Sequence, residues 1–477
     1  MNVQLDSIEL PNIPEQDFNI IDQGAKYDDV FNNQKSIQDT INICAQHGGG
    51  RVLIPAGIWV TGPLQLRSKV NLHLEKGATL LFHSHFEQYP LISSSFEGEP
   101  TIRCQSPIDG ENLEDISITG EGVIDGGGEA WRPVKKFKMT EKQWETLIGK
   151  GGVIAKNSNQ EEVWWPSEAA YKGSIIIEQL KAMKQDVESY QEIREFLRPN
   201  LISLRKCKRI LLDGPTFQQS PAWNIHPWFC ENVTVRNVHV KNPWYSQNGD
   251  GIDIESCKNV LVEHSIFDVG DDAMCIKSGK NEIGRRLNRP SENIWIQHCK
   301  VFHGHGGFVV GSEMSGGVKN VSISHCQFYG TDTGLRFKSS RERGGLVENL
   351  FIANITMVNI QKEAIVFQMD YEQEGQVEKE YKVTEKTPTF REIEFKNIVC
   401  HHAGYSLVMK GLKENRLEGI RFEQLNVKAK KGVLLSNCKD IEFINCSFET
   451  EETQKIWLIS NCELVQTNNV LLNNQII

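Results

Sequence analysis

The chain has 477 residues, 39 glycines, 8% aromatic residues and a formal net charge of -10. This acidic balance argues against nucleic acid as a partner, and an acidic polymer would have to bind through local basic groups. The chain has no apolar run of about 18 residues, the length that a membrane span needs, and residues 1–20 lack the basic and apolar regions of a signal peptide. We therefore expect no membrane partner and a cytoplasmic location.

The twelve cysteines show no CxxC pairing of the metal-binding type. Cys257, Cys299, Cys326 and Cys446 lie in or beside strand-like segments, and two of them are 27 residues apart (326 − 299). We interpret them as small apolar residues of a core and not as a disulfide framework. Free thiols fit a reducing compartment.

A capping helix is predicted near the start of the chain. Ile37, Ile41, Cys44 and Ala45 give residues 36–45 an apolar face at helical spacing, and glycines 48–50 end it before the strand-like RVLIPAG. Such a helix would cover the open edge of the first coil of a repeat fold. Strand-like segments follow at 70–82, 115–126 and 209–217.

Residues 129–200 differ from the rest because they are rich in Lys, Glu and Gln and have helical periodicity. We predict a helical insertion near an active-site cleft, since insertions in repeat proteins gather on one face, often the binding face. A surface embellishment without a role is the alternative.

From residue 208 a repeat is visible. Five asparagines each begin a segment of alternating apolar residues, at spacings of 27, 34, 27 and 29 residues: Asn232, Asn259, Asn293, Asn320 and Asn349. Coils of this length without intervening helices indicate an all-β parallel β-helix forming one domain over 1–477, whereas the blades of a propeller, the alternative, need ~40–50 residues. We interpret 281–290 as a lengthened turn, and the last 25 residues, which show no clear repeat, as the C-terminal closure.

Three carboxylates follow the same repeat. Asp271 and Asp272 are adjacent after Gly270, and Asp250 lies 21 residues earlier (271 − 250), close to one coil. Stacked coils stand ~4.8 Å apart, so the three acids would share a patch in which repulsion raises at least one pKa. A protonated acid beside an ionised base can cleave a glycosidic bond. Turn residues on a solvated loop are the alternative.

Two further groups follow in the chain. His305 is flanked by glycines at 304, 306 and 307, which would leave its imidazole beside a ligand. Arg336 and Lys338 are two apart on a strand-like segment, so they project from one face and could hold a carboxylate. Taken alone, an incidental histidine and a solvated charged face are the simpler interpretations.

The ordered set N-x-D, G-D-D, G-H-G and R-x-K resembles the polygalacturonase family of glycoside hydrolases, family 28. The motifs stand at 248–250, 270–272, 304–306 and 336–338, and QGAKYDD and GGGRVLIPAG near the start are also similar. The resemblance implies a right-handed parallel β-helix that cleaves α-1,4-galacturonosidic bonds with inversion and without cofactor or metal. GSEMSGGV (311–318) and RGG (343–345) resemble the exo-acting branch, which would release galacturonate from short chains.

The resemblance also implies catalytic roles. Asp271 would protonate the leaving oxygen, Asp250 and Asp272 would position and deprotonate water, and His305 would support the protonation of Asp271. An inverting mechanism further leads us to expect acid and base carboxyls ~6.5–9.5 Å apart.

Substrate-binding residues follow in the same way. Arg336 and Lys338 would hold a galacturonate carboxylate, and Asn248 and Tyr371 are candidates for further contacts. Gly249 stands where the family usually has threonine, which brings local rigidity and subsite shape into question.

Three other functions stay open at this point. A rhamnogalacturonan or xylogalacturonan hydrolase would use the same fold. A pectate lyase would hold Ca²⁺ with the clustered carboxylates. A carbohydrate-binding solenoid without turnover is the third.

Overall fold

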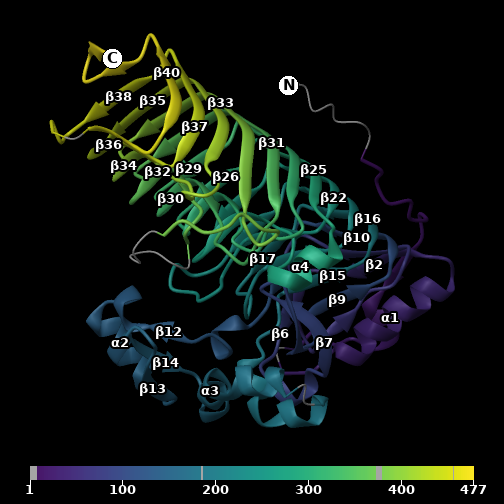
Figure 1. Cartoon of the computed structure of the whole chain (residues 1–477). Helices are drawn as coiled ribbons and strands as arrows, with labels where there is room; N and C mark the ends of the chain where they lie inside the picture. The colour runs from purple at the N-terminus through teal and green to yellow at the C-terminus, as the bar shows by residue number, and fades with distance from the viewer. Residues whose placement is uncertain (1–7, 29, 184–185, 372–378, 455) are drawn as a thin grey trace.

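The computed structural model describes the chain apart from residues 1–7, 29, 184–185, 372–378 and 455. Its strands stack in parallel along one axis and form a right-handed parallel β-helix, which confirms the predicted fold (Figure 1). Most coils contribute one strand to a twelve-stranded sheet. Its strands are β4 (Leu64–Gln65), β9 (Ile108–Glu111), β15 (Ile202–Arg205), β18 (Ile225–Trp228), β21 (Ile252–Glu255), β24 (Asp272–Lys277), β27 (Gly306–Val310), β30 (Thr333–Lys338), β32 (Glu363–Gln368), β34 (Tyr405–Lys410), β36 (Lys431–Ser436) and β39 (Trp457–Ser460).

The other walls of the solenoid belong to a 25-stranded sheet. Its strands are β1 (Asp17–Asn19), β2 (Gly50–Ile54), β3 (Gly57–Thr61), β5 (Val70–Leu74), β6 (Ala78–Phe82), β10 (Glu114–Gly120), β11 (Val123–Asp125), β16 (Lys208–Asp213), β17 (Thr216–Gln218), β19 (Glu231–Arg236), β20 (His239–Lys241), β22 (Lys258–Glu263), β23 (Ile266–Asp268), β25 (Ser291–Gln297), β26 (Lys300–Phe302), β28 (Val318–Ser324), β29 (Gln327–Tyr329), β31 (Leu346–Val358), β33 (Thr389–His401), β35 (Leu417–Ala429), β37 (Cys438–Ile444), β38 (Ser447–Thr450), β40 (Glu463–Asn468), β41 (Leu471–Leu472) and β42 (Gln475–Ile476).

The core is a column of apolar side chains in register from coil to coil. In one such rung Val233 pairs with Val260, which pairs with Ile294, and all three are at most 1% exposed. Burial of each such side chain stabilises the fold by about 1.5–3 kcal/mol relative to an exposed one. All twelve cysteines are free and eleven are buried, nine of them in this core.

The repeating asparagines have a structural cause. Each of the five adopts a left-handed backbone conformation, with φ from 55° to 60°. Among non-glycine residues asparagine tolerates this conformation best. Its amide nitrogen also donates to the amide oxygen one coil earlier, at 3.2 Å from Asn259 to Asn232 and 3.0 Å from Asn293 to Asn259. The repeat therefore marks the same turn in successive coils.

The N-terminal end is covered as predicted. Helix α1 (Gln34–Gln46) buries Ile37, Ile41 and Cys44 over the first coils. Gly49 ends the helix region with a φ of 109°, and a Cβ atom there would overlap the carbonyl of Lys69. Only glycine fits this turn.

The segment 129–200 projects beside the solenoid (Figure 1). It contains α2 (Glu141–Ile148), α3 (Glu168–Ala182) and three 3-10 segments, η3 (Gly128–Ala130), η4 (Lys136–Lys138) and η5 (Val187–Phe196). It also contains a small antiparallel sheet that the sequence analysis did not predict, formed by β12 (Val134–Lys135), β14 (Glu162–Trp165) and β13 (Val153–Lys156). These strands have two to four residues, too few for a periodic pattern.

Three other segments differ from prediction. An antiparallel hairpin, β7 (Leu91–Phe96) and β8 (Glu99–Cys104), lies before the insertion, and two further 3-10 turns occur, η1 (Ile20–Gln23) and η2 (Phe86–Gln88). The supposed long turn 281–290 contains a helix, α4 (Asn281–Leu287). The last residues continue the coil through β39, β40 and β41 before β42 turns back antiparallel, so the expected loss of the repeat was wrong. Within the described residues, no helix has the length and apolar character needed to cross a membrane.

Candidate active site

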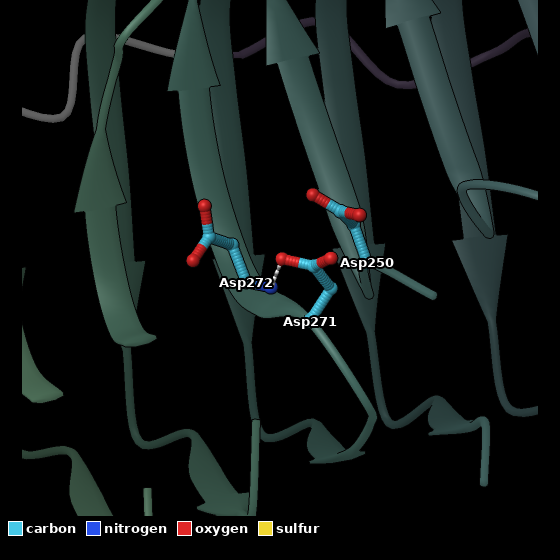
Figure 2. A group of neighbouring side chains, drawn as sticks. All are labelled: Asp250, Asp271 and Asp272. Carbon is cyan, nitrogen blue, oxygen red and sulfur yellow. Dashed lines mark hydrogen bonds between the residues drawn. The ribbon is translucent and has the colours of Figure 1, made fainter. Parts of the chain in front are cut away.

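The three predicted carboxylates lie together on the twelve-stranded sheet (Figure 2). Asp250 comes just before β21, Asp271 just before β24, and Asp272 is the first residue of β24. Since Ile252 pairs with Met274, Asp250 stands beside Asp272 on the neighbouring coil. One oxygen from each carboxylate lies within 4.8 Å of the others. This spacing is shorter than the ~6.5–9.5 Å expected for an inverting pair.

A bend before β24 turns both adjacent acids toward one face, as their shared site requires. The backbone N–H of Asp272 donates to Oδ1 of Asp271 at 3.0 Å, the contact drawn in Figure 2. The ring of His305 reaches the same oxygen, with Nδ1 at 3.0 Å, and its backbone N–H donates to the carbonyl of Asp271 at 3.0 Å. Oδ1 of Asp271 thus faces both the Asp272 N–H and Nδ1 of the His305 ring.

Asp272 is held by the basic pair two coils away. Lys338 Nζ donates to Oδ2 of Asp272 at 2.8 Å, and Arg336 Nη1 lies 3.7 Å from its Oδ1. The intervening coil presents Gly306, where an added Cβ would stand only 3.4 Å from Asp272 Oδ1. The glycine next to His305 therefore leaves room for the basic side chains to reach across.

A second charged layer lies beside the cluster and was missed by the sequence analysis. Lys277 Nζ is 3.0 Å from Glu313 and 3.7 Å from Asp253, which is fully buried with both oxygens lacking a hydrogen-bond partner among the described residues. The polar positions of IDIE, alternating with core isoleucines, were a signal that could have identified Asp253. Glu313 lies in the GSEMSGGV loop.

Burial and neighbouring charges shift the pKa values of the carboxylates in opposite directions. Desolvation, with the negative charges of Asp253 and Asp271, raises the pKa of Asp250 well above its ordinary value. Burial also raises the pKa of Asp271, but the charges of His305, Lys338 and Lys138 outweigh it and hold that pKa well below its usual range. The cluster therefore has one member that favours a proton and one that favours ionisation, as repulsion among the three predicts.

A cavity of about 690 Å³ opens beside the cluster. Among the predicted residues His305, Arg336 and Tyr371 line it, and the ring of Tyr371 lies 5.3 Å from the Arg336 guanidinium. Its wall carries five cationic side chains, Lys135, Lys138, Arg336, Lys362 and Lys410, together with the aromatic residues Phe137 and Trp244. In a chain with a net charge of -10 this is a local basic site.

The insertion supplies part of this wall. Lys135, Phe137 and Lys138 all come from it, and Lys138 Nζ lies 3.3 Å from His305 Nε2. The indole N–H of Trp244 donates to the carbonyl of Lys138 at 2.9 Å, which ties the insertion to the loop before Asn248. Lys138 was also missed, because the insertion belongs to no repeat and so has no positional register.

Asn248 and Gly249 occupy the other side of the cluster. Asn248 Oδ1 accepts from Arg198 at 2.9 Å, and Asn248 lines a second cavity of about 310 Å³, which shares Lys135 and Gln247 with the first. A Cβ at Gly249 would overlap the hydroxyl of Ser246. The glycine that replaces the usual threonine thus has a local cause, since Ser246 fills the space that a side chain would need.

Comparison with known proteins identifies the family to which this β-helix is similar. The model of glycosyl hydrolases family 28 matches residues 184–449. The chain belongs to this family. A crystal structure of a hyperthermoactive exopolygalacturonase from Thermotoga maritima superposes with a TM-score of 0.78 and 30% identity, covering 92% of this chain and 93% of that chain.

Curated relatives agree with this assignment. A probable polygalacturonase of Vitis vinifera is 26% identical over 440 residues, 89% of this chain and 77% of the relative. An exo-poly-alpha-D-galacturonosidase of Dickeya chrysanthemi is 28% identical over 369 residues, 74% of this chain and 57% of the relative. The resemblance predicted from the four motifs is confirmed, and this family 28 protein is a glycoside hydrolase.

Proposed function

We propose that this hydrolase cleaves α-1,4-galacturonosidic bonds at the end of short pectic chains and releases galacturonate with inversion. One observation carries the proposal: a carboxylate cluster lies beside a cavity whose wall carries five cationic side chains, in a protein whose net charge is negative. Uronate carboxylates are the sugar groups that such cations bind. Relatives named exopolygalacturonase and exo-poly-alpha-D-galacturonosidase support the same substrate class.

Attack at a chain end is supported by the insertion. A groove along a β-helix would admit a polymer from both sides, whereas here Lys135, Phe137 and Lys138 stand in the cavity wall. Tyr245, from the loop before Asn248, packs against the insertion core of Val134, Trp144, Leu147 and Trp164. The wall is therefore packed onto the site.

In the reaction Asp271 would give its proton from Oδ2 to the leaving glycosidic oxygen. Water held by Asp250 and Asp272 would attack the anomeric carbon from the opposite face and lose a proton to one of them. Hydrogen bonds between oxygens measure about 2.7–2.8 Å, so one water can bridge two carboxylate oxygens that lie within 4.8 Å. The short separation is compatible with inversion if the water bridges two acids instead of facing one.

The basic pair takes two different roles in this proposal. Arg336, which lines the cavity beside Tyr371, would bind a galacturonate carboxylate. Lys338 has a buried side chain bonded to Asp272, so we assign it to positioning Asp272. This differs from the direct substrate contact that the family resemblance implied.

A calcium-dependent lyase is a weaker candidate on structural grounds. A divalent cation at the cluster would have to compete with Lys338, whose ammonium already bonds to Asp272. Positive charge beside a carboxylate disfavours a second cation there. Hydrolysis without a metal is the function that these contacts support.

Short oligogalacturonides in the cytoplasm are the proposed setting, and the eleven buried, unpaired thiols support it. Fractionation of the source cells, with a cytoplasmic marker enzyme as reference, checks the location.

The decisive experiment follows the first products formed from trigalacturonate and longer chains. We expect galacturonate alone at early times, with little fall in polymer viscosity, and NMR should show the β-anomer first because inversion converts an α-linkage to a β-product. Mixed oligomers before monomer would refute chain-end attack, and activity only on rhamnose- or xylose-bearing pectins would reassign the substrate.

A further inference from the structure

Lys138 joins the insertion to the catalytic machinery. It is the last residue of η4, and its Nζ lies 3.3 Å from Nε2 of His305 and 3.3 Å from the carbonyl oxygen of Gly270. Its own carbonyl accepts from the Trp244 indole at 2.9 Å. Contacts at both the backbone and the side chain of Lys138 thus hold its ammonium group in place.

This contact determines where the histidine carries its proton. A lysine ammonium has donors and no acceptor, so Nε2 of His305 must accept. In the neutral ring the remaining proton then sits on Nδ1, which lies 3.0 Å from Oδ1 of Asp271. A second proton on Nε2 would place two N–H donors and two positive charges face to face.

We propose that Lys138 is a positioning residue for the catalytic acid: it holds His305 as the neutral Nδ1–H tautomer, so that Nδ1–H donates to Oδ1 of Asp271 and leaves Oδ2 for the proton transfer. The reaction assigned to Asp271 rests on the proposed function. The tautomer of His305 does not, because it is a property of the enzyme without substrate.

The tautomer also changes the charge around Asp271. A positively charged His305 contributes to holding the pKa of Asp271 low, together with Lys338 and Lys138. A neutral ring removes the contribution of the imidazolium charge and still donates to Oδ1, so Oδ2 stays available for the proton transfer. Burial lowers the pKa of Lys138 below its ordinary value. The negative charges of Asp271 and Asp332 raise this pKa, and the positive charges of Lys135 and Lys362 lower it.

The test uses the full chain labelled with ¹⁵N-histidine. The His305 signals are assigned by their loss in His305→Gln, and the two-bond ¹H–¹⁵N pattern identifies the tautomer. We expect the Nδ1–H tautomer of His305 in the wild type. In Lys138→Met the donor to Nε2 is lost, so a share of the molecules should carry a proton on Nε2.

Two variants separate this role from others. Lys138→Arg should restore the neutral tautomer, because a guanidinium also donates to Nε2. Lys136→Met is the matched control: Lys136 is two residues away and bonds to Glu162 at 2.8 Å, so its loss removes the same charge from the same segment. It should leave the tautomer and kcat unchanged.

Kinetics on trigalacturonate provide the second measurement. Loss of a residue that orients a catalytic group costs on the order of 10–100-fold in activity. We expect this loss in kcat for Lys138→Met, with KM within twofold. An imidazolium or Nε2–H form in the wild type, or an unchanged tautomer in Lys138→Met, would overturn the proposal. A raised KM with unchanged kcat would also overturn it and make Lys138 a substrate ligand.

Discussion

Replacing Lys338 by methionine tests whether this lysine serves Asp272 or the substrate. Methionine keeps most of the side-chain length and removes the ammonium, which bonds to Asp272 Oδ2 at 2.8 Å. Both side chains are buried, at 9% and 2% exposure, so water cannot replace the lost partner. Arg336, 3.7 Å from the other oxygen, stays as the nearest cation.

The expected cost follows from this burial. Removing one partner of a buried ion pair destabilises a protein by about 3–5 kcal/mol, because the other charge stays uncompensated. The nearby Arg336 favours the lower end, about 3 kcal/mol. A chain this long should lose about 1–2 °C per kcal/mol, less than the ~2–4 °C of 150–250-residue domains, so Tm should fall by about 3–6 °C.

The pH dependence gives a sign that can be checked. Burial lowers the pKa of Lys338, but the charge of Asp272 outweighs it and the pKa is raised above its ordinary value. The stabilisation is therefore complete below the unfolded pKa of about 10.4 and is lost as pH rises through the folded value. The difference in Tm between wild type and Lys338→Met should be constant from pH 6 to 8 and shrink above pH 10.

Steady-state kinetics on trigalacturonate and thermal unfolding decide between the two roles. A misplaced base should lower kcat by about 10²-fold or more, since such groups contribute 10²–10⁴-fold, while KM changes little. Arg336→Ala, in contrast, should raise KM for galacturonides. A higher KM with unchanged kcat and Tm in Lys338→Met would refute our assignment and return Lys338 to the substrate.

Three further outcomes are expected. Asp271→Asn should lower kcat by about 10²–10⁴-fold with the far-UV spectrum unchanged, because only the acid is lost; residual activity near wild type would exclude Asp271 as the proton donor. Gly249→Thr should lower Tm and activity, because its side chain would overlap Ser246, and Gly249→Thr with Ser246→Gly should recover part of both; equal damage in the double variant would contradict the packing explanation. Treatment with EDTA should leave activity unchanged and yield no product with the ultraviolet absorption of an unsaturated uronide, and chelator sensitivity would favour the lyase.

The sequence was informative wherever the chain repeats. Asn232, Asn259 and Asn293 mark one turn of successive coils, so their spacing indicated the coil length. The 21-residue interval between Asp250 and Asp271 predicted that these acids lie on neighbouring coils, and the register of the structure places Asp250 beside Asp272. The fold followed from such periodic positions, whereas the family followed from the resemblance of the four ordered motifs. The catalytic roles of these acids are still predictions, and the distances give them a geometry without testing them.

Non-periodic features were hidden for a physical reason. Lys138 reaches His305 across 167 residues of sequence from a segment without register, and no local pattern encodes that approach. The short strands of the insertion and the helix α4 depend on tertiary packing in the same way. The sequence predicted that Lys338 and Arg336 project from the same face of their strand. The contact of Lys338 with Asp272 could not be predicted, because it depends on the space left by Gly306 on the coil between them.

The buried thiols of the core can be used to follow which coils of the solenoid open first. From Cys44 to Cys446, nine of the eleven buried cysteines belong to the apolar core of the solenoid, each on its own stretch of backbone. A thiol reagent can modify such a residue only while its coil is open. The order in which the cysteines are labelled under native conditions would therefore report whether the solenoid frays from its ends or opens beside the cavity.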